Sequence, residues 1–349
     1  MTYISGLCAD VGTVNCPCPL ADTGDCLICS RLAGKDECSC EWAGVCVYNE
    51  YIQNGSVIRG ARENRQVDIL KKIWYGKETV IIVLRVSRGF ALRAARPGSF
   101  VFVTPVGKSE ISNVPISVMR ADPEKGELFI AIRTISAKTK AIACEEKSLL
   151  LRGVYRNGLL GRGLEGLRED CADRKSDRKK WLVITKGMGF APAVNLTAAA
   201  AEHVDMDFIV DTDKVGDDIV MDYLQKNVDS DKACRCGAQI SFRKASLEQA
   251  VKKMNLQRGG TEIWRERRNQ VVPEGFNADV YDRIILLTSD YYIKALSEYM
   301  RIPPHKLVYS NNFRMCCGEG ICGACGHIDS RGNVSKMCKC RSVNVAELL

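Results

Sequence analysis

The chain has 349 residues, 46% of them hydrophobic and 26% charged, with a formal net charge of +8. These values predict a globular protein of two or three domains and do not favour nucleic acid as a partner. No apolar run approaches the ~20 residues that cross a bilayer, and no signal peptide is visible. We therefore expect a cytoplasmic protein without a membrane partner.

Cysteine is the most informative residue type, because the chain has 18 cysteines and only 3 histidines. Clustered cysteines in a chain without an export signal indicate metal binding in a reducing cytosol rather than a disulfide scaffold. The scattered histidines do not favour imidazole-rich zinc or copper sites. We therefore expect metal sites built from thiolates.

Residues 1–55 form a cysteine-rich module with too few apolar residues to fold on a hydrophobic core alone. Metal–thiolate bonds would supply the missing folding energy. Four thiolates suffice for one 4Fe-4S cluster, and zinc is the alternative because spacing does not separate the two. Which cysteines are spare stays open. Besides Cys8, the module contains the candidate ligands Cys16, Cys18, Cys26, Cys29, Cys38, Cys40 and Cys46.

Between residues 66 and 162 the pattern changes to short runs rich in β-branched and aromatic residues. Turn signals such as Pro97-Gly98 and Asp122-Pro123 separate them. Short strands at this spacing predict an antiparallel barrel. The expected strands cover residues 79–86, 99–103, 116–119, 128–132 and 149–151.

Residues 178–305 alternate strands and helices, which predicts a parallel α/β sheet. A strand from Trp181 enters the turn Lys186-Gly187-Met188-Gly189 and then an alanine-rich helix. Such a turn brings backbone N–H groups and a helix N-terminus to a phosphate, although a turn without any ligand has the same pattern. Residues 232–278, which contain Cys234-x-Cys236, are interpreted as an insertion.

The last segment, residues 306–349, has the spacing Cys317-x4-Cys322-x2-Cys325, followed by Cys338. This is the plant-type pattern for a 2Fe-2S cluster, in which four thiolates hold two irons. Three glycines between the first and third cysteines permit the sharp turns that such a loop needs. A structural zinc site is the alternative, but it usually presents two C-x2-C pairs.

Segments of the barrel and the sheet resemble, in the same order, those of the ferredoxin-reductase superfamily. They are Arg96-Pro97-Gly98-Ser99-Phe100, Val114-Pro115-Ile116-Ser117, Ile132-Arg133, Lys138-Thr139, residues 153–159 and Gly187-Met188-Gly189. The resemblance implies a flavin-binding β-barrel followed by a Rossmann-like nucleotide domain. It implies FAD contacts at Val114, Pro115, Ile116, Ser117, Ala131, Ile132, Arg133, Lys138 and Thr139, and a nucleotide-phosphate turn at Gly187 and Gly189.

With the C-terminal loop included, residues 66–349 resemble the iron-sulfur electron-transfer subunit of type B dihydroorotate dehydrogenase. In that family the subunit takes electrons from NADH onto FAD and passes them singly, through a 2Fe-2S centre, to a partner flavoenzyme. The resemblance does not cover the N-terminal module or the insertion.

Three positions depart from this family. Val114 replaces an arginine that pairs with flavin phosphate, and Lys186 replaces the first glycine of the phosphate turn. Residues 286–290 replace a Cys-Gly-Pro turn beside the nicotinamide. We expect FAD to bind, with Arg133 helping to hold its phosphates, and NAD(P)H to reduce the chain slowly or not at all.

Together these features predict an electron-transfer subunit of an anaerobic oxidoreductase complex, active with a partner oxidoreductase subunit or a ferredoxin. Its fold would combine the barrel, the Rossmann-like domain, a 2Fe-2S loop domain and the N-terminal metal module. One alternative is a non-enzymatic iron-sulfur scaffold or relay with degenerate flavin and nicotinamide sites. Another is that the N-terminal module is a zinc-bound adaptor.

Overall fold

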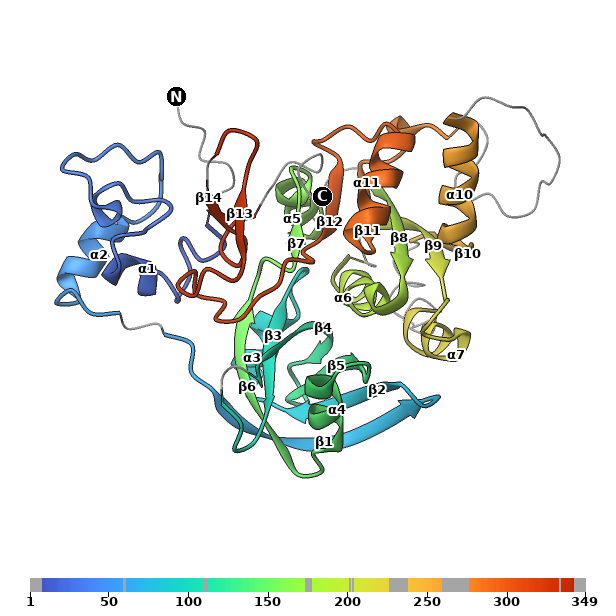
Figure 1. The fold of residues 1–349 in the computed structure, drawn as a ribbon, viewed down its shortest axis with the longest axis horizontal. Coiled ribbons are helices and arrows are strands. Elements are labelled where there is room, and N and C mark those ends of the chain that lie inside the picture. The colour runs from blue at the N-terminus through green and yellow to red at the C-terminus, as the bar shows by residue number, and fades with distance from the viewer. Residues whose placement is uncertain are drawn as a thin grey trace.

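The computed structural model describes residues 8–58, 61–109, 112–172, 178–200, 202, 204–225, 238–258, 276–332 and 334–341. A small N-terminal module, a barrel, a sheet covered by helices and a C-terminal loop with a hairpin follow one another along the chain (Figure 1). None of the helices among these residues is long and apolar enough to span a membrane.

The N-terminal module has little regular structure. It contains α1 (Pro19–Asp22), a 3-10 turn (Arg31–Ala33) and α2 (Val47–Gln53). Its buried cluster is small and includes two cysteines: Cys8, Val11, Ala21, Ile28, Cys29, Leu32 and Val47. A core of this size cannot by itself offset the conformational entropy lost by some fifty ordered residues.

The predicted antiparallel barrel is confirmed. Six strands close on themselves in the order β1-β2-β5-β4-β3-β6, and every pair is antiparallel. α3 (Arg88–Ala94) and α4 (Ala137–Cys144) complete this part. The strands are β1 (Arg65–Tyr75), β2 (Thr79–Arg85), β3 (Phe100–Pro105), β4 (Val114–Asp122), β5 (Glu127–Arg133) and β6 (Ser148–Tyr155).

The second sheet has six strands in the order β10-β9-β8-β11-β12-β7. The first five are parallel, as predicted, and β7 adds an antiparallel edge. The strands are β7 (Leu159–Leu160), β8 (Lys179–Lys186), β9 (Val204–Asp211), β10 (Ile240–Lys244), β11 (Arg283–Leu287) and β12 (Leu307–Ser310). The helices are α5 (Leu164–Ala172), α6 (Phe190–Ala200), α7 (Asp217–Val220), α10 (Leu247–Arg258) and α11 (Asp290–Tyr299).

The range predicted as an insertion, residues 232–278, contributes to this sheet. Within it β10 pairs in parallel with β9, and α10 follows, so this part continues the alternation of strand and helix. Cys234 and Cys236 lie outside the described residues.

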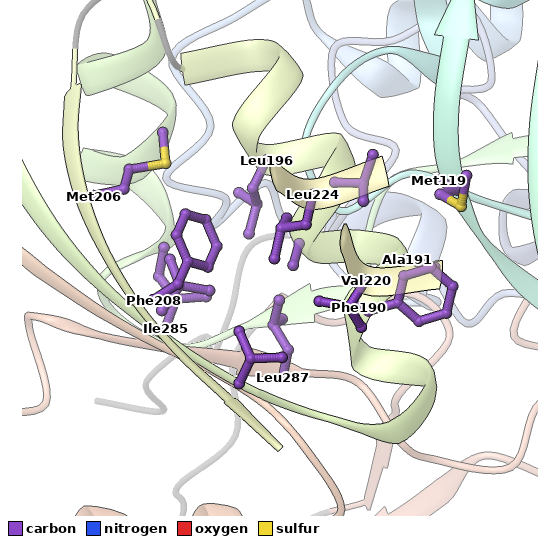
Figure 2. Packing of buried hydrophobic residues seen from close by; sticks show 14 of the residues in the cluster. Met119, Phe190, Ala191, Leu196, Met206, Phe208, Val220, Leu224, Ile285 and Leu287 are labelled. Atoms are coloured by element: carbon purple, nitrogen blue, oxygen red, sulfur yellow. The ribbon is translucent and has the colours of Figure 1, made fainter. Parts of the chain in front are cut away.

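Helix α6 joins the barrel to the sheet. Leu196 of α6 packs with Phe208 of β9 and Leu287 of β11, and the same buried cluster reaches Met119 of β4 in the barrel (Figure 2). Burying each of these large side chains contributes about 1.5–3 kcal/mol. The barrel and the sheet therefore share a hydrophobic core across α6, which holds the space between them in a defined shape.

The C-terminal loop is followed by a hairpin of β13 (Gly326–Ile328) and β14 (Val334–Lys336). The loop packs against the edge of the sheet formed by β12 and β7. Cys325, Cys338 and Cys340 belong to the same buried cluster as Leu160 and Tyr309 of the sheet edge. The backbone N–H of Ala9 also donates to the carbonyl of Lys339 at 2.7 Å. The first and last described segments are thus in direct contact.

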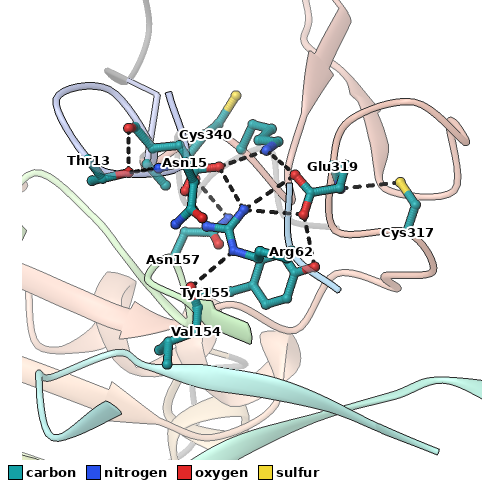
Figure 3. Close-up of polar contacts among 12 residues, drawn as sticks. Thr13, Asn15, Arg62, Val154, Tyr155, Asn157, Cys317, Glu319 and Cys340 are labelled. Carbon is teal, nitrogen blue, oxygen red and sulfur yellow. Dashed lines mark hydrogen bonds and ion pairs between the residues drawn. The ribbon is translucent and has the colours of Figure 1, made fainter. Parts of the chain in front are cut away.

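A buried network of four charges connects the N-terminal module to the C-terminal loop (Figure 3). Lys339 Nζ lies 2.7 Å from a carboxylate oxygen of Asp10 and 2.7 Å from one of Glu319. Arg62 pairs with the same two carboxylates, and its guanidinium lies 4.2 Å from the centre of the Tyr155 ring. The two cations neutralise the two anions in a place from which water is excluded.

Removal of one cation should therefore be costly. We expect Lys339→Ala and Lys339→Met each to lower the free energy of unfolding by about 3–5 kcal/mol, because Asp10 and Glu319 would then share one buried cation. Chemical denaturation under anaerobic conditions measures this loss. The control is Lys336→Ala, whose ammonium lies 3.1 Å from the exposed Asp25 and should matter far less. Equal losses in the two positions would contradict the assigned role of the network.

Candidate cofactor and metal sites

A cavity of about 440 Å³ lies where the barrel, the sheet and the C-terminal segment meet. It opens at the carboxyl ends of β8 and β11, the edge at which open α/β sheets bind ligands. The walls are Phe100, Pro115, Ser117 and Gly158 from the barrel; Lys186, Met188, Gly189 and Pro192 from the strand–helix turn; and Leu287, Thr288, Ser289, Ser310, Asn311, Asn312, Phe313 and Met315.

Strand β4 presents alternate residues to this cavity. Pro115 and Ser117 line it, whereas Val114 and Ile116 pack against the barrel core. Ala131 and Ile132 of β5 are buried in hydrophobic clusters. The alternation follows from the two-residue period of a strand, so only half of a contiguous motif can face one ligand.

Three other predicted FAD contacts lie elsewhere. Among the described residues, Arg133, Lys138 and Thr139 are not part of the cavity wall. Arg133 Nη2 lies 2.7 Å from Oε2 of Glu78, and the Thr139 hydroxyl accepts from the backbone N–H of Ser136 in the capping box that begins α4. Arg133 and Thr139 thus have partners close by, and none of the three side chains lines the cavity.

The turn between β8 and α6 is shaped by packing. Gly187 has a φ of +57°, which favours glycine. A Cβ atom at Gly189 would lie 1.9 Å from the carbonyl oxygen of Leu287, so glycine is required for the close approach of the turn to β11. Both the turn and β11 also line the cavity.

Lys186 already has anionic partners in this turn. Its ammonium lies 2.6 Å from Oδ2 of Asp211, a buried carboxylate, and 3.4 Å from Asp213. Burial, the largest single influence, would lower the pKa of Lys186, but the hydrogen bonds and charges of Asp211 and Asp213 together outweigh burial and raise that pKa. The charge that could attract a nucleotide phosphate is therefore neutralised by the protein itself.

The end of β11 is closed by polar contacts. The carbonyl oxygen of Thr288 accepts from the hydroxyl of Ser310 and from the amide of Asn312, both at 2.8 Å. The same amide donates to Asp290 Oδ1 at 2.8 Å. These side chains occupy the edge at which the family that the sequence resembles has a glycine.

The four cysteines of the C-terminal loop form one connected group. The sulfur of Cys338 interacts with those of Cys317 and Cys325, and the sulfur of Cys322 with that of Cys317. Backbone N–H groups donate to sulfur as well, from Glu319 to Cys317 at 3.3 Å and from Cys338 to Cys325 at 3.3 Å. The bonds to Cys317 lower the pKa of its thiol well below the ordinary value, which favours the thiolate.

This donor set fits a two-iron cluster. Among the residues that the structure describes, no group of three or more His, Cys, Asp or Glu side chains is placed to hold a metal ion. A 2Fe-2S core divides four thiolates into pairs and needs no point at which three sulfurs converge. N–H groups directed at sulfur are also what such clusters require from the surrounding backbone.

Sequence reasoning missed part of the cavity wall. Asn311, Asn312 and Phe313 line it together with Met315, yet these three follow β12 and belong to no motif. Their position in the sequence could have predicted this role, because a segment that joins β12 to the cysteine loop passes the cavity. The N-terminal cysteines are likewise placed in a way that spacing did not reveal, as described below.

No protein-family model matches the chain, and no curated protein matches it. A solved structure of an NADH-dependent reduced ferredoxin–NADP oxidoreductase, described for flavin-based electron bifurcation, aligns with 80% of this chain and 88% of its own at 17% identity and a TM-score of 0.52. A ferredoxin reductase in carbazole 1,9a-dioxygenase aligns with 73% of this chain and 71% of its own, at 14% identity and a TM-score of 0.47.

The closed antiparallel barrel followed by the mixed, helix-covered sheet is the ferredoxin-reductase-like fold. The likeness concerns the fold alone. The narrower resemblance to the iron-sulfur subunit of type B dihydroorotate dehydrogenase stays a prediction.

The packing role of Gly189 can be tested. Gly189→Ala should lower the free energy of unfolding by about 1–3 kcal/mol, because the added methyl group displaces either the turn or β11. The control is Gly89→Ala in helix α3, where the added Cβ atom would lie 3.7 Å from its nearest neighbour, Nη1 of Arg93. This substitution should raise the free energy of unfolding by about 0.5–1 kcal/mol. Thermal and chemical unfolding measure both. An unchanged stability for Gly189→Ala would show that the turn yields easily and that glycine is retained there for another reason.

Proposed function

We propose that this chain is an electron-transfer subunit that binds FAD in the cavity and a 2Fe-2S cluster on Cys317, Cys322, Cys325 and Cys338, and that works with a partner oxidoreductase or a ferredoxin. FAD would accept electrons in pairs, and the cluster would accept them singly. The compartment that suits such a protein is an anaerobic cytoplasm, because exposed clusters and thiolates react with oxygen.

The observation that carries the proposal is that the cavity and the thiol loop share a wall. Met315 lines the cavity and stands two residues before Cys317. Asn311, another wall residue, donates to the carbonyl of Met337 at 3.1 Å, next to Cys338. A flavin in the cavity and a cluster on the loop would therefore be neighbours.

Aromatic packing supports the same arrangement. Phe100 of the cavity wall stacks on Tyr155 with ring centres 5.1 Å apart and contacts Phe102 edge-on. A Cβ atom at Gly318 would lie 2.6 Å from Phe102 and 2.7 Å from Tyr155, so the loop rests directly on these rings. The packed rings of Phe100, Phe102 and Tyr155 thus connect the cavity wall to the loop.

Within this proposal, FAD is held chiefly by shape. The cavity wall combines apolar residues such as Phe100, Leu287 and Phe313 with hydroxyl and amide side chains such as Thr288, Ser310 and Asn312. Val114 stands where the family that the sequence resembles has an arginine for the flavin phosphate. The wall offers no replacement for that charge, because Lys186 already forms an ion pair with Asp211. A second candidate function, the scaffold or relay without flavin, rests on these same missing charges.

Paired variants test the proposed sites. Anaerobically purified protein should contain flavin together with acid-labile sulfide and iron. Ser117→Phe fills the cavity and should remove the flavin while the iron-sulfur spectrum of the loop stays. Cys322→Ser should do the reverse. Arg133→Ala is the control: because Arg133 pairs with Glu78 away from the cavity, it should cost less flavin than Ser117→Phe.

Two results would change the proposal. Wild-type protein that contains no flavin and binds none when it is added would favour the scaffold or relay. Protein that contains zinc and no sulfide would remove the redox role altogether.

A further expectation concerns the electron donor. Lys186 is neutralised, glycine is absent at the end of β11, and Asp290 adds a negative charge there. We expect NADH and NADPH to reduce the isolated chain slowly or not at all, because nothing in this wall offers a free cation to the nucleotide phosphates. Anaerobic stopped-flow mixing with each nucleotide measures the rate of flavin reduction. Flavin bleaching within milliseconds would show that the nucleotide site works.

A further inference from the structure

The eight cysteines of the N-terminal module are divided between two cavities. One, of about 270 Å³, is lined by Cys29, Cys38, Cys40 and Cys46. The other, of about 20 Å³, is lined by Cys8, Cys16, Cys18 and Cys26. No cysteine lines both cavities, and none of the eight is left over.

A wall separates the two sets. Ile28 and Val47 line both cavities and so stand between them. The pair Cys26-x2-Cys29, which could chelate one metal from a single turn, is instead split by this wall, with Cys26 on one side and Cys29 on the other. The backbone N–H of Cys29 donates to Sγ of Cys26 at 3.4 Å, which keeps the turn tight across the boundary.

We propose that the module holds two separate metal centres, each with four thiolate ligands, rather than one cluster with spare cysteines. The inference rests on the proposed metal-binding role of the module and extends it. It assigns Cys8 as a ligand, which spacing alone did not, and it leaves no cysteine of the module without a place.

The two cavities suit different centres. A space of about 270 Å³ accommodates a 4Fe-4S cluster, in which each iron takes one of the four thiolates. A space of about 20 Å³ is near that of a single water molecule and suits one ion. Among the described residues no three ligands already converge on one point, so the smaller set would have to close around a single iron or zinc ion as it binds, to give tetrahedral thiolate coordination.

The two centres also differ in position. Leu20 of α1 lines the smaller cavity and packs on the C-terminal loop, where a Cβ atom at Gly320 would lie 3.0 Å from it. Asp10 lines the same cavity and belongs to the four-charge network. The larger cavity is lined by Val47 and Tyr48 of α2, and Cys38 and Cys46 in its wall are exposed. Helix α2 lies farther from the C-terminal hairpin than α1 does (Figure 1). The single ion would stabilise the contact between the N-terminal module and the C-terminal loop. The cluster would lie near the surface, where a partner protein could approach it.

Metal analysis of single and double variants of the full chain, purified anaerobically, tests this assignment. Cys38→Ser should remove about four irons with their sulfide and leave the other metals. Cys18→Ser should remove about one atom of iron or zinc and leave the 4Fe-4S spectrum. The double variant should lose the sum. Cys144→Ser, which changes an exposed cysteine at the end of α4, is the control and should lose nothing.

The two-centre assignment is overturned if Cys18→Ser and Cys38→Ser remove the same centre, so that the double variant loses no more than either one. If Cys18→Ser does not fold, Cys16→Ser replaces it, and the wild-type content still decides: about five metal atoms beyond the C-terminal cluster are expected, against four for a single cluster. Flavin and the C-terminal 2Fe-2S signal are read in the same samples. Their loss in wild-type protein would indicate failure of the proposed function, not of this division.

Discussion

The fold depends on the buried ion pairs among Asp10, Arg62, Glu319 and Lys339. Each of these charges would be costly to bury alone, and their attraction offsets that cost only when all four are present. They come from the N-terminal module, the segment before the barrel and two parts of the cysteine loop. The pairing of these four charges thus fixes how the N-terminal module and the cysteine loop are placed against the barrel.

Hydrophobic packing sets the rest of the site. Helix α6 is buried between the sheet and β4 of the barrel, so the cavity lies between two bodies that share one core. The aromatic rings of Phe100, Phe102 and Tyr155 pack together, and the thiol loop contacts Phe102 and Tyr155 at Gly318. Because these rings contact both the cavity and the loop, a substitution in this aromatic cluster would change the packing of both.

Local patterns predicted the architecture well. Five of the six barrel strands, the parallel strands β8, β9 and β11 and the glycine turn follow from residue alternation and turn chemistry, which act over a few positions, whereas β1 was not among the expected strands. What escaped prediction depends on distant partners. Lys186 meets Asp211 only because β8 and β9 are adjacent, and Arg133 meets Glu78 only through the pairing of β2 with β5. The division of the cysteines escaped for the same reason, because spacing does not encode the wall formed by Ile28 and Val47.

The contact of Ala9 with Lys339 has a consequence for biosynthesis. A chain leaves the ribosome from its N-terminus, so Asp10 and Arg62 are made long before Glu319 and Lys339. Until the last of these emerges, the early segment has neither the carboxylate nor the ammonium that completes its ion pairs. The N-terminal module therefore completes this network only after the C-terminal loop is made, and a chain that stops before Glu319 would keep the Asp10–Arg62 pair alone.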